Sequence, residues 1–397
     1  MNRFSTVIIL MLALIALPAC EIVATGIDDE PIRQTESGLP EPTGPYRVGE
    51  TSLLVVDEDR DDAYTPEADL RELNVRLWYP ADQEGLGSVV YMHPTVAELF
   101  SITQDYLPAD DMIATISTVE TASSVGAPIT SAIPRVPVVF LSHGLGGVNS
   151  LYSTFAAELA SHGYLVVGID HTYGAFATVF PDGTIKSIRT GANAPEFVDI
   201  VNIWALDLSS VLDRLTELDA ADPSGLLTGR LDLTRVGAMG HSTGGSAAAE
   251  VHTFDSRFRA AVTLDAPQVG EAADGAGVDD PIMLFFAEPS DYASSAVANR
   301  LRAPGYSLTV SGTTHYSYTD LPTLLELADV PDEDRQASNR PPGTLDPARN
   351  NRIILDWSLA FFDRYLRGGT APLLDQTGGA YPEVQARRIG VVSLAGR

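Results

Sequence analysis

From residue 136 onward the chain alternates short apolar runs with segments in which apolar residues recur three and four positions apart. Short continuous apolar runs are typical of strands that are buried on both faces of a sheet. Such runs are Val138–Leu141, Tyr164–Ile169, Val236–Met239, Ala260–Leu264, Ile282–Ala287 and Tyr306–Val310. The helical spacing is clearest over residues 152–160, 197–215 and 353–366. This order of strand and helix predicts a mostly parallel central sheet with helices on both faces.

The pattern is weaker between residues 46 and 135. Two strands are predicted at Ser52–Val56 and Leu73–Tyr79. In the second, Val75, Leu77 and Tyr79 alternate with Asn74, Arg76 and Trp78. Residues 82–134 mix apolar clusters with prolines and show no strand period. We expect this segment to form either a lid or substrate-facing insertion, or an ordinary covering layer.

The first 20 residues have the pattern of a targeting segment. Arg3 is followed by the apolar run Phe4–Leu17, which is too short to span a membrane as a helix. We predict a signal peptide over residues 1–19. Leu17–Cys20 resembles a bacterial lipobox, although its proline is unusual, so that Cys20, the only cysteine, would carry a lipid anchor in the bacterial cell envelope. Ordinary secretion is the alternative, and both place the protein outside the cytoplasm.

Composition narrows the class of protein. Residues 20–45 combine prolines with acidic residues and have no apolar period, which predicts a disordered tether to one domain over residues 46–397. The chain is 45% hydrophobic and carries a formal net charge of -28, so we expect a globular core and no nucleic-acid partner. The glycine-rich segments lack both a P-loop lysine and a dinucleotide-binding spacing, so no nucleotide cofactor is expected.

The candidate chemistry centres on Gly240-His241-Ser242-Thr243-Gly244, between a predicted strand and an alanine-rich helix. This is the G-x-S-x-G nucleophile-elbow pattern in the strand-turn-helix context that it requires. The glycines allow a turn so sharp that the Ser242 side chain is exposed. The Thr243 amide, at the start of the helix, would point toward an oxygen that becomes negative. The alternative is a glycine-rich helix start that is capped by a serine.

A serine hydroxyl becomes a good nucleophile when a base removes its proton, and an imidazole can do so near neutral pH. The α/β-hydrolase fold places serine, acid and histidine in that order along the chain. His315 fits, because it follows the last predicted strand in a loop rich in glycine and threonine. The histidines set aside are His241 and His252, too near the serine along the chain, and His162 and His171, which precede it.

The acid and the second oxyanion donor must come from other loops. Position alone leaves three acids open, namely Asp265 at the end of a buried strand, and Glu288 and Asp291 after the next strand. The expected second donor is the Leu145 amide, in the glycine-rich loop that follows an earlier strand. His143 is expected to brace that loop, and a simple tight turn is the alternative.

Longer stretches around these motifs carry a family likeness. They are Phe140–Gly147, Leu151–Ser153, Leu159–His171, Gly240–Gly245, Phe258–Ala266 and Gly312–His315. Together they resemble the platelet-activating-factor acetylhydrolase family over about residues 70–367. The chain departs from the family at Thr243, where an aromatic residue is frequent, and over residues 86–133.

The resemblance implies an α/β-hydrolase fold and assigns a role to each candidate. Ser242 would be the nucleophile, Asp265 the acid and His315 the base, and the Leu145 and Thr243 amides would form the oxyanion hole. It also implies that no metal is needed, and that short or oxidised acyl chains on phospholipids are the substrates.

Taken together, these inferences predict a secreted or lipid-anchored serine carboxylesterase that works through an acyl-enzyme without a cofactor. Its expected partners are an ester or phospholipid substrate and, through Cys20, a membrane. One alternative is a broader lipase, cutinase or polyester hydrolase of the same fold. The other is a non-catalytic surface lipoprotein that keeps the fold as a binding module.

Overall fold

The computed structural model describes residues 33–83, 85–103, 109–191, 194–338, 340–376 and 380–390. These all belong to one compact unit, Ile32–Arg397. The predicted signal peptide and Cys20 lie outside the described residues. Within the described part of the chain, no helix combines the length and the apolar character that crossing a membrane requires.

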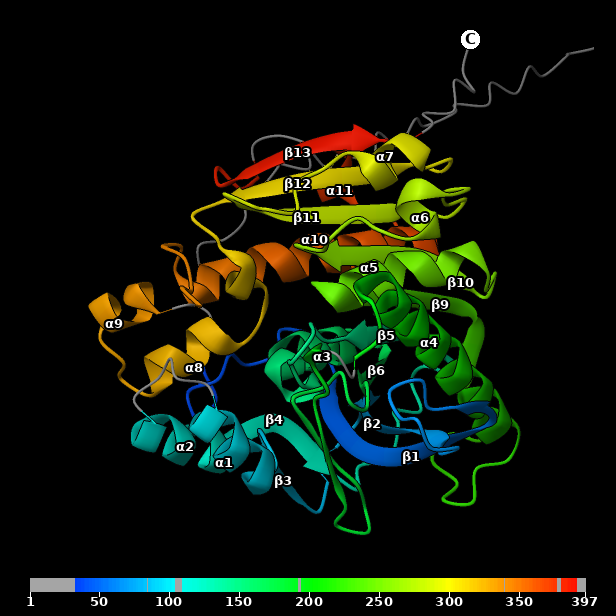
Figure 1. Cartoon of the computed structure of the whole chain (residues 1–397), viewed down its shortest axis with the longest axis vertical. Helices are drawn as coiled ribbons and strands as arrows, with labels where there is room; N and C mark the ends of the chain where they lie inside the picture. The colour runs from blue at the N-terminus through cyan, green and yellow to red at the C-terminus, as the bar shows by residue number, and fades with distance from the viewer. Residues whose placement is uncertain are drawn as a thin grey trace, which may run out of the picture. The chain divides into compact units, whose positions relative to one another are not determined.

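A sheet of 11 strands, in the order β13-β12-β11-β10-β9-β5-β6-β2-β1-β4-β3, runs through the unit (Figure 1). Its central strands are parallel to one another: β5 (Val136–Ser142), β6 (Leu165–Asp170), β9 (Leu231–His241), β10 (Phe258–Leu264), β11 (Ile282–Glu288) and β12 (Gly305–Ser311). Each contains one of the predicted apolar runs, and all but β9 and the ends of β11 and β12 are buried almost throughout. The mostly parallel sheet is therefore confirmed.

Antiparallel strands lie beside the parallel core on both sides. β2 (Leu70–Ala81) pairs antiparallel with β6 and with β1 (Arg47–Asp61), and both strands are longer than predicted. On the other side β13 (Val384–Ile389), which the hydrophobic pattern did not predict, pairs antiparallel with β12 and ends the sheet. A separate hairpin is formed by β7 (Ala177–Val179) and β8 (Ile185–Ser187).

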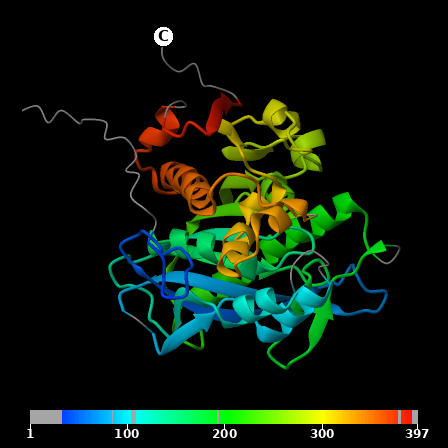
Figure 2. The same cartoon turned by 90° about the vertical axis from the view of Figure 1, so that its left-hand side faces the viewer.

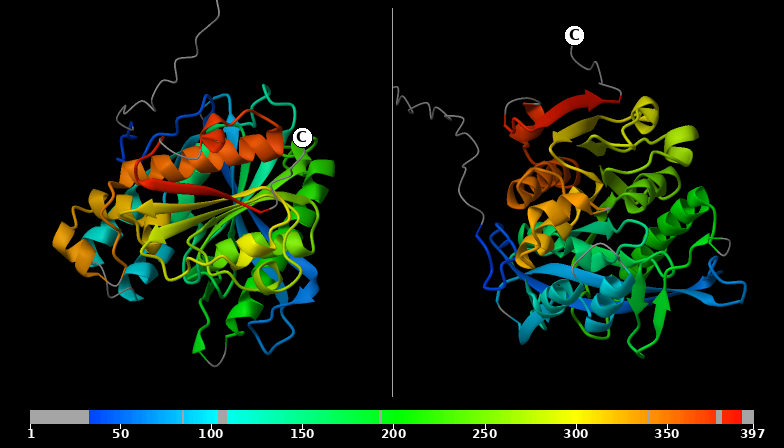
Figure 3. Two further views of the ribbon diagram at one scale, coloured as in Figure 1. Left: turned by 90° about the horizontal axis from the view of Figure 1, so that it is seen from above. Right: turned by 60° about the vertical axis from the view of Figure 1, so that its left-hand side comes forward.

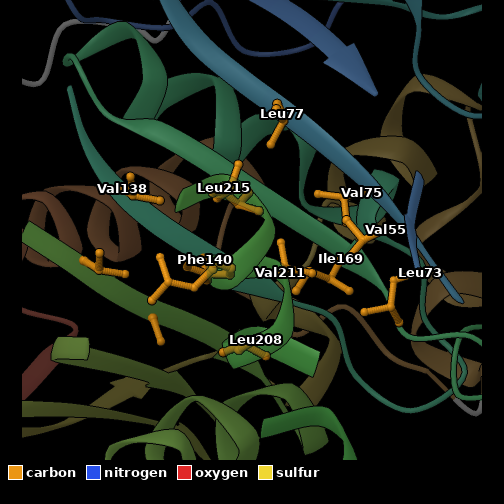
Figure 4. Packing of buried hydrophobic residues seen from close by; sticks show 14 of the residues in the cluster. Val55, Leu73, Val75, Leu77, Val138, Phe140, Ile169, Leu208, Val211 and Leu215 are labelled. Atoms are coloured by element: carbon orange, nitrogen blue, oxygen red, sulfur yellow. The ribbon is translucent and has the colours of Figure 1, made fainter. Parts of the chain in front are cut away.

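Helices cover both faces of the sheet (Figure 3). α4 (Phe197–Ala220) and α5 (Thr243–Glu250) lie on one face, and α3 (Ser153–Ser161) and α10 (Pro347–Arg367) on the other. The predicted apolar face of α4 packs on the strands: Leu208, Val211 and Leu215 meet Val138, Phe140 and Ile169 (Figure 4). The remaining helical segments are η1 (Asn149–Tyr152), η3 (Val251–Thr253), α6 (Glu271–Asp274), α7 (Ala296–Arg300), η4 (His315–Tyr318), α8 (Leu321–Leu327), α9 (Asp332–Ala337) and α11 (Pro372–Asp375).

Residues 82–134, whose structure the sequence left open, extend the sheet. β4 (Glu120–Val125) pairs parallel with β1, and β3 (Gly87–Val90) pairs antiparallel with β4. Between them come α1 (Pro94–Thr103) and α2 (Ala109–Thr118), and α2 packs against α8 (Figure 2). Part of the segment is therefore a continuation of the sheet, and a role of α1 and α2 as a lid stays a prediction.

The structure differs from the tether prediction over residues 33–45. This segment lies on α3, where the Thr43 amide donates to Glu158 Oε2 at 2.7 Å and the Gly44 amide donates to Ser161 Oγ at 3.0 Å. The Glu158 side chain is largely buried, so its carboxylate requires such partners. Prolines and acidic residues occur in docked loops as well as in disordered chain, and the sequence pattern could not separate the two.

Candidate active site

Ser242 lies between the end of β9 and the start of α5, with φ 54° and ψ -125°. A non-glycine residue at positive φ is strained, and such strain persists only where the surroundings hold the turn in place. The two glycines of the motif allow the neighbouring backbone to pack close enough to hold this turn. A Cβ on Gly240 would lie 2.2 Å from the Gly244 carbonyl oxygen, and one on Gly244 would lie 2.3 Å from the His143 carbonyl oxygen. The predicted elbow is therefore present, and Ser242 is partly exposed.

Gly240→Ala is expected to destabilise the protein by about 3 kcal/mol, because the new methyl group overlaps backbone that cannot move away. Gly87→Ala is the matched control, since Gly87 has no atom within 4 Å of the added Cβ. Thermal unfolding followed by circular dichroism measures both variants. Equal unfolding temperatures for the two would contradict the packing described for the elbow.

His315 and Asp265 come from separate loops and meet at the carboxyl edge of the sheet. His315 begins η4 after β12, and its Nδ1 lies 2.8 Å from Asp265 Oδ2 directly after β10. The other carboxylate oxygen of Asp265 accepts the Ala287 amide at 3.0 Å and the Ser290 hydroxyl at 2.5 Å. The Asp265 side chain is 2% exposed, so these bonds replace the water that it has lost.

The two acids that position alone left open lie elsewhere. Glu288 accepts a hydrogen bond from the Ser311 hydroxyl, and Asp291 is exposed. Neither pairs with His315 among the described residues. The geometry therefore favours Asp265 as the partner of His315.

The glycine-rich loop after β5 lies directly against the elbow. A Cβ added to Gly144 would be 3.1 Å from Ser242 Cβ. His143 braces the loop as predicted, since its Nδ1 lies 2.7 Å from the Gly144 carbonyl oxygen and its Nε2 accepts the His171 amide at 3.1 Å. Burial lowers the pKa of His143 to about 3, so its ring stays neutral. The amide of Leu145, in the same loop, has no partner among the described residues and is available to a ligand.

A second serine-histidine-aspartate arrangement, which was not predicted from the sequence, lies beneath this loop. His171 Nε2 is 2.7 Å from Ser142 Oγ, and His171 Nδ1 is 2.8 Å from Asp207 Oδ2. The side chains of His171 and Asp207 are fully buried, so no substrate reaches this arrangement. Burial alone would raise the pKa of Asp207, but the nearby Arg71, at 2.7 Å, holds it far below its ordinary value. The arrangement supports the end of β5. Its members lie far apart in the sequence, so that only the folded structure shows that they meet.

Aromatic side chains surround the His315 ring. The rings of Tyr292 and Tyr316 have their centroids 5.0 Å and 5.3 Å from that of His315. The Arg340 guanidinium lies 5.1 Å over the Tyr316 ring. These residues could not be singled out from the sequence, because they carry no motif and lie far apart along the chain.

Asp320 anchors the chain that follows His315. It is fully buried before α8, and its Oδ2 accepts the Tyr91 hydroxyl at 3.0 Å and the Thr154 amide at 3.1 Å. Burial raises the pKa of Asp320 from 3.8 to about 7. The folded state therefore binds a proton that the unfolded chain releases, and this contribution to stability is lost as the pH rises through about 7.

Asp320→Asn is expected to flatten that pH dependence, because asparagine keeps an acceptor for Tyr91 and Thr154 without a titrating carboxyl. Relative to the variant, the wild-type protein should lose on the order of 2 kcal/mol of stability between about pH 5 and about pH 8. Urea unfolding at both pH values measures the difference, with the exposed Asp291→Asn as the control. A constant difference between wild type and variant would contradict the assignment.

Comparisons with known proteins find relatives among esterases. A profile of the family described as "Platelet-activating factor acetylhydrolase, isoform II" matches residues 32–189 and 218–368. The platelet-activating factor acetylhydrolase of Cavia porcellus is 24% identical over 315 residues, which cover 71% of this chain and 69% of that protein. A probable 1-alkyl-2-acetylglycerophosphocholine esterase of Arthroderma benhamiae is 24% identical over 266 residues, covering 63% of this chain and 65% of that protein.

A solved structure is also similar over most of the chain. A ferulic acid esterase from Streptomyces cinnamoneus matches with a TM-score of 0.73 and 32% identity, covering 87% of this chain and 97% of that one. The mostly parallel sheet with helices on both faces and these esterase relatives define the chain as an α/β hydrolase that acts on carboxylic esters. It belongs to the platelet-activating factor acetylhydrolase isoform II family, whose profile matches more than half of its residues.

Proposed function

We propose that Ser242, His315 and Asp265 form the catalytic triad of this esterase, with the Leu145 and Thr243 amides as the oxyanion hole. The observation that carries the proposal is the 2.8 Å contact between His315 Nδ1 and the buried Asp265 carboxylate. With Nδ1–H donating to the carboxylate, the imidazole exposes Nε2 as a base. The strained elbow supports the proposal, because it holds the Ser242 hydroxyl at the same edge of the sheet.

The reaction follows from these roles. His315 Nε2 takes the Ser242 hydroxyl proton while the serine oxygen attacks the ester carbonyl carbon. The negative oxygen of the tetrahedral intermediate accepts hydrogen bonds from the two amides. As the carbon-oxygen bond to the alcohol breaks, His315 returns the proton to the leaving oxygen. Water, deprotonated by the same imidazole, then cleaves the acyl-enzyme and releases the carboxylic acid.

We propose short-chain esters, including acetyl esters on phospholipids, as the substrates. The names of the Cavia porcellus and Arthroderma benhamiae relatives support this class. A second candidate is an ester of an aromatic acid. It is favoured by the ferulic acid esterase neighbour and by the aromatic rings of Tyr292 and Tyr316 beside His315.

A series of p-nitrophenyl esters of increasing acyl length separates these substrates, with methyl ferulate as the aromatic acyl ester and Ser242→Ala as the blank. Serine-dependent activity that is greatest from acetyl to butyryl supports the acetylhydrolase-like function. Activity that rises with chain length indicates a lipase or cutinase instead. A specificity constant kcat/KM for methyl ferulate above those of all the aliphatic esters favours the aromatic candidate.

We further propose that the protein is exported and held to a membrane by a lipid on Cys20. The short apolar run before Leu17–Cys20 supports this localisation. The test is fractionation of cells that express the full chain or its Cys20→Ser variant. Recovery of the wild-type protein in membranes and of the variant in the soluble extracytoplasmic fraction is expected. Equal recovery of both in the soluble fraction contradicts anchoring.

A further inference from the structure

The contacts around His241 point to a role for this residue and for Tyr152 that no motif assigns. We infer that the Tyr152 hydroxyl and the His241 imidazole form one buried hydrogen-bonded chain. This chain positions the glycine-rich loop after β5 (residues 144–147, the oxyanion loop) against the loop of His315. Both are positioning residues, since they act through other groups and do not touch the ester. The inference rests on the proposed function, because it assumes that these loops carry the catalytic groups.

The direction of each hydrogen bond in the chain is fixed. His241 Nε2 lies 2.9 Å from the His315 carbonyl oxygen, which can only accept, so Nε2 carries the proton. His241 Nδ1 is then an acceptor, and it lies 2.8 Å from the Tyr152 hydroxyl, which donates to it. The same hydroxyl accepts the Gly144 amide at 3.2 Å. One tautomer of His241 therefore satisfies every member of the chain.

Burial keeps both side chains neutral. Tyr152 is 1% exposed and His241 is 3% exposed. Burial, together with the His315 ring whose centroid is 4.4 Å away, lowers the pKa of His241 well below its ordinary value. Burial raises the pKa of the Tyr152 hydroxyl. Neither side chain therefore gains or loses a proton near neutral pH. This suits a fixed support, whereas a group that carries protons must change its protonation state.

The chain also determines which amide of the loop is free. Tyr152 occupies the Gly144 amide, whereas the Leu145 amide has no partner among the described residues. A Cβ added to Gly144 would lie 3.1 Å from His241 Nδ1, so the loop packs directly on the imidazole. His241 thus contacts the oxyanion loop on one side and the His315 backbone on the other. In the polypeptide it directly precedes Ser242. An imidazole has polar atoms on two edges, and this explains a histidine at that position of the elbow.

Positioning errors of about 1 Å in such a site can lower turnover about a hundredfold without weakening substrate binding. We therefore expect Tyr152→Phe to lower kcat on p-nitrophenyl acetate about tenfold, with KM changed less than about threefold. His241→Asn, whose amide is too short to reach the His315 carbonyl, should lower kcat about a hundredfold. His241→Gln should recover part of that loss, because its longer side chain places an N–H donor near the position of Nε2.

Matched controls separate positioning from general stability. Tyr79, on β2, is also a buried tyrosine, 1% exposed. Its hydroxyl donates to the Ala127 carbonyl at 2.9 Å. Tyr79→Phe should lower the unfolding temperature about as much as Tyr152→Phe while leaving kcat unchanged. In a double-mutant cycle, Tyr152→Phe should cost little further activity in the His241→Asn background, because the chain is already broken there.

The outcomes that overturn the inference are distinct from those that overturn the triad. If Ser242→Ala abolishes hydrolysis but Tyr152→Phe and His241→Asn keep kcat within about twofold, the positioning role is wrong and the triad stands. The positioning role is also wrong if Tyr79→Phe lowers kcat as much as Tyr152→Phe, or if the effects of Tyr152→Phe and His241→Asn add in full. If Ser242→Ala retains activity, the proposed function itself fails.

Discussion

Ser242→Ala is expected to lower kcat for p-nitrophenyl esters by roughly 10⁴-fold or more, while the folded structure is retained. Alanine removes the hydroxyl that would form the acyl-enzyme, and only the oxyanion amides and substrate binding remain to promote attack by water. The backbone at this position, with φ 54°, accepts alanine as it accepts serine, so the elbow should persist. Steady-state kinetics together with a circular dichroism spectrum measure both properties.

The control for this prediction is a serine in the helix that the elbow opens. Ser246 lies on α5, and its hydroxyl donates to the Pro267 carbonyl at 2.5 Å. Ser246→Ala should therefore keep activity within about fivefold of the wild type. Turnover of Ser242→Ala close to that of the control would exclude Ser242 as the nucleophile.

The second largest effect is expected for Asp265→Asn, which should lower kcat by about 10³- to 10⁴-fold at neutral pH. Asp265 Oδ1 accepts the Ala287 amide, so asparagine would keep its carbonyl oxygen there and turn its NH₂ group toward His315. An NH₂ group cannot accept the Nδ1 proton, and the imidazole would adopt the tautomer whose Nε2 is protonated and unable to act as a base.

Asp291→Asn is the matched control, because Asp291 is an exposed aspartate that position along the chain left open as the acid. It should alter kcat by no more than about twofold. The pH dependence of kcat for both variants completes the measurement. A large loss in Asp291→Asn with normal turnover in Asp265→Asn would reassign the acid.

The parallel core of the fold could be predicted because each central strand is a continuous apolar run that needs burial on both faces. The outermost strands, β3 and β13, could not be predicted. β3 has exposed residues and pairs with β4 alone, and β13 contains only exposed and half-buried residues. Such edge strands are defined by the neighbour they pair with, which a short segment of sequence does not contain. The docking of residues 33–45 depends in the same way on Glu158, more than 100 positions away.

The candidate site likewise contains features that local sequence predicts and features that depend on distant contacts. The elbow is a local motif, and the order of Ser242 and His315 along the chain predicted their pairing with an acid. Choosing Asp265 over Asp291 required the family resemblance, and the structure places Asp265 Oδ2 2.8 Å from His315 Nδ1. His241 was set aside as a base because it lies beside Ser242, and its support of the His315 loop depends on a bond across 74 positions. Contacts of this kind follow from packing and not from spacing.

The role of Ser242 as nucleophile is tested most directly by stoichiometric labelling of the folded protein with a fluorophosphonate, followed by mass spectrometry of its peptides and assay of residual esterase activity. We expect one label on each molecule, located on Ser242, with hydrolysis lost in proportion to labelling and no label on Ser242→Ala. Full esterase activity in protein that takes up no label, or labelling at another serine with equal loss of activity, would contradict that role.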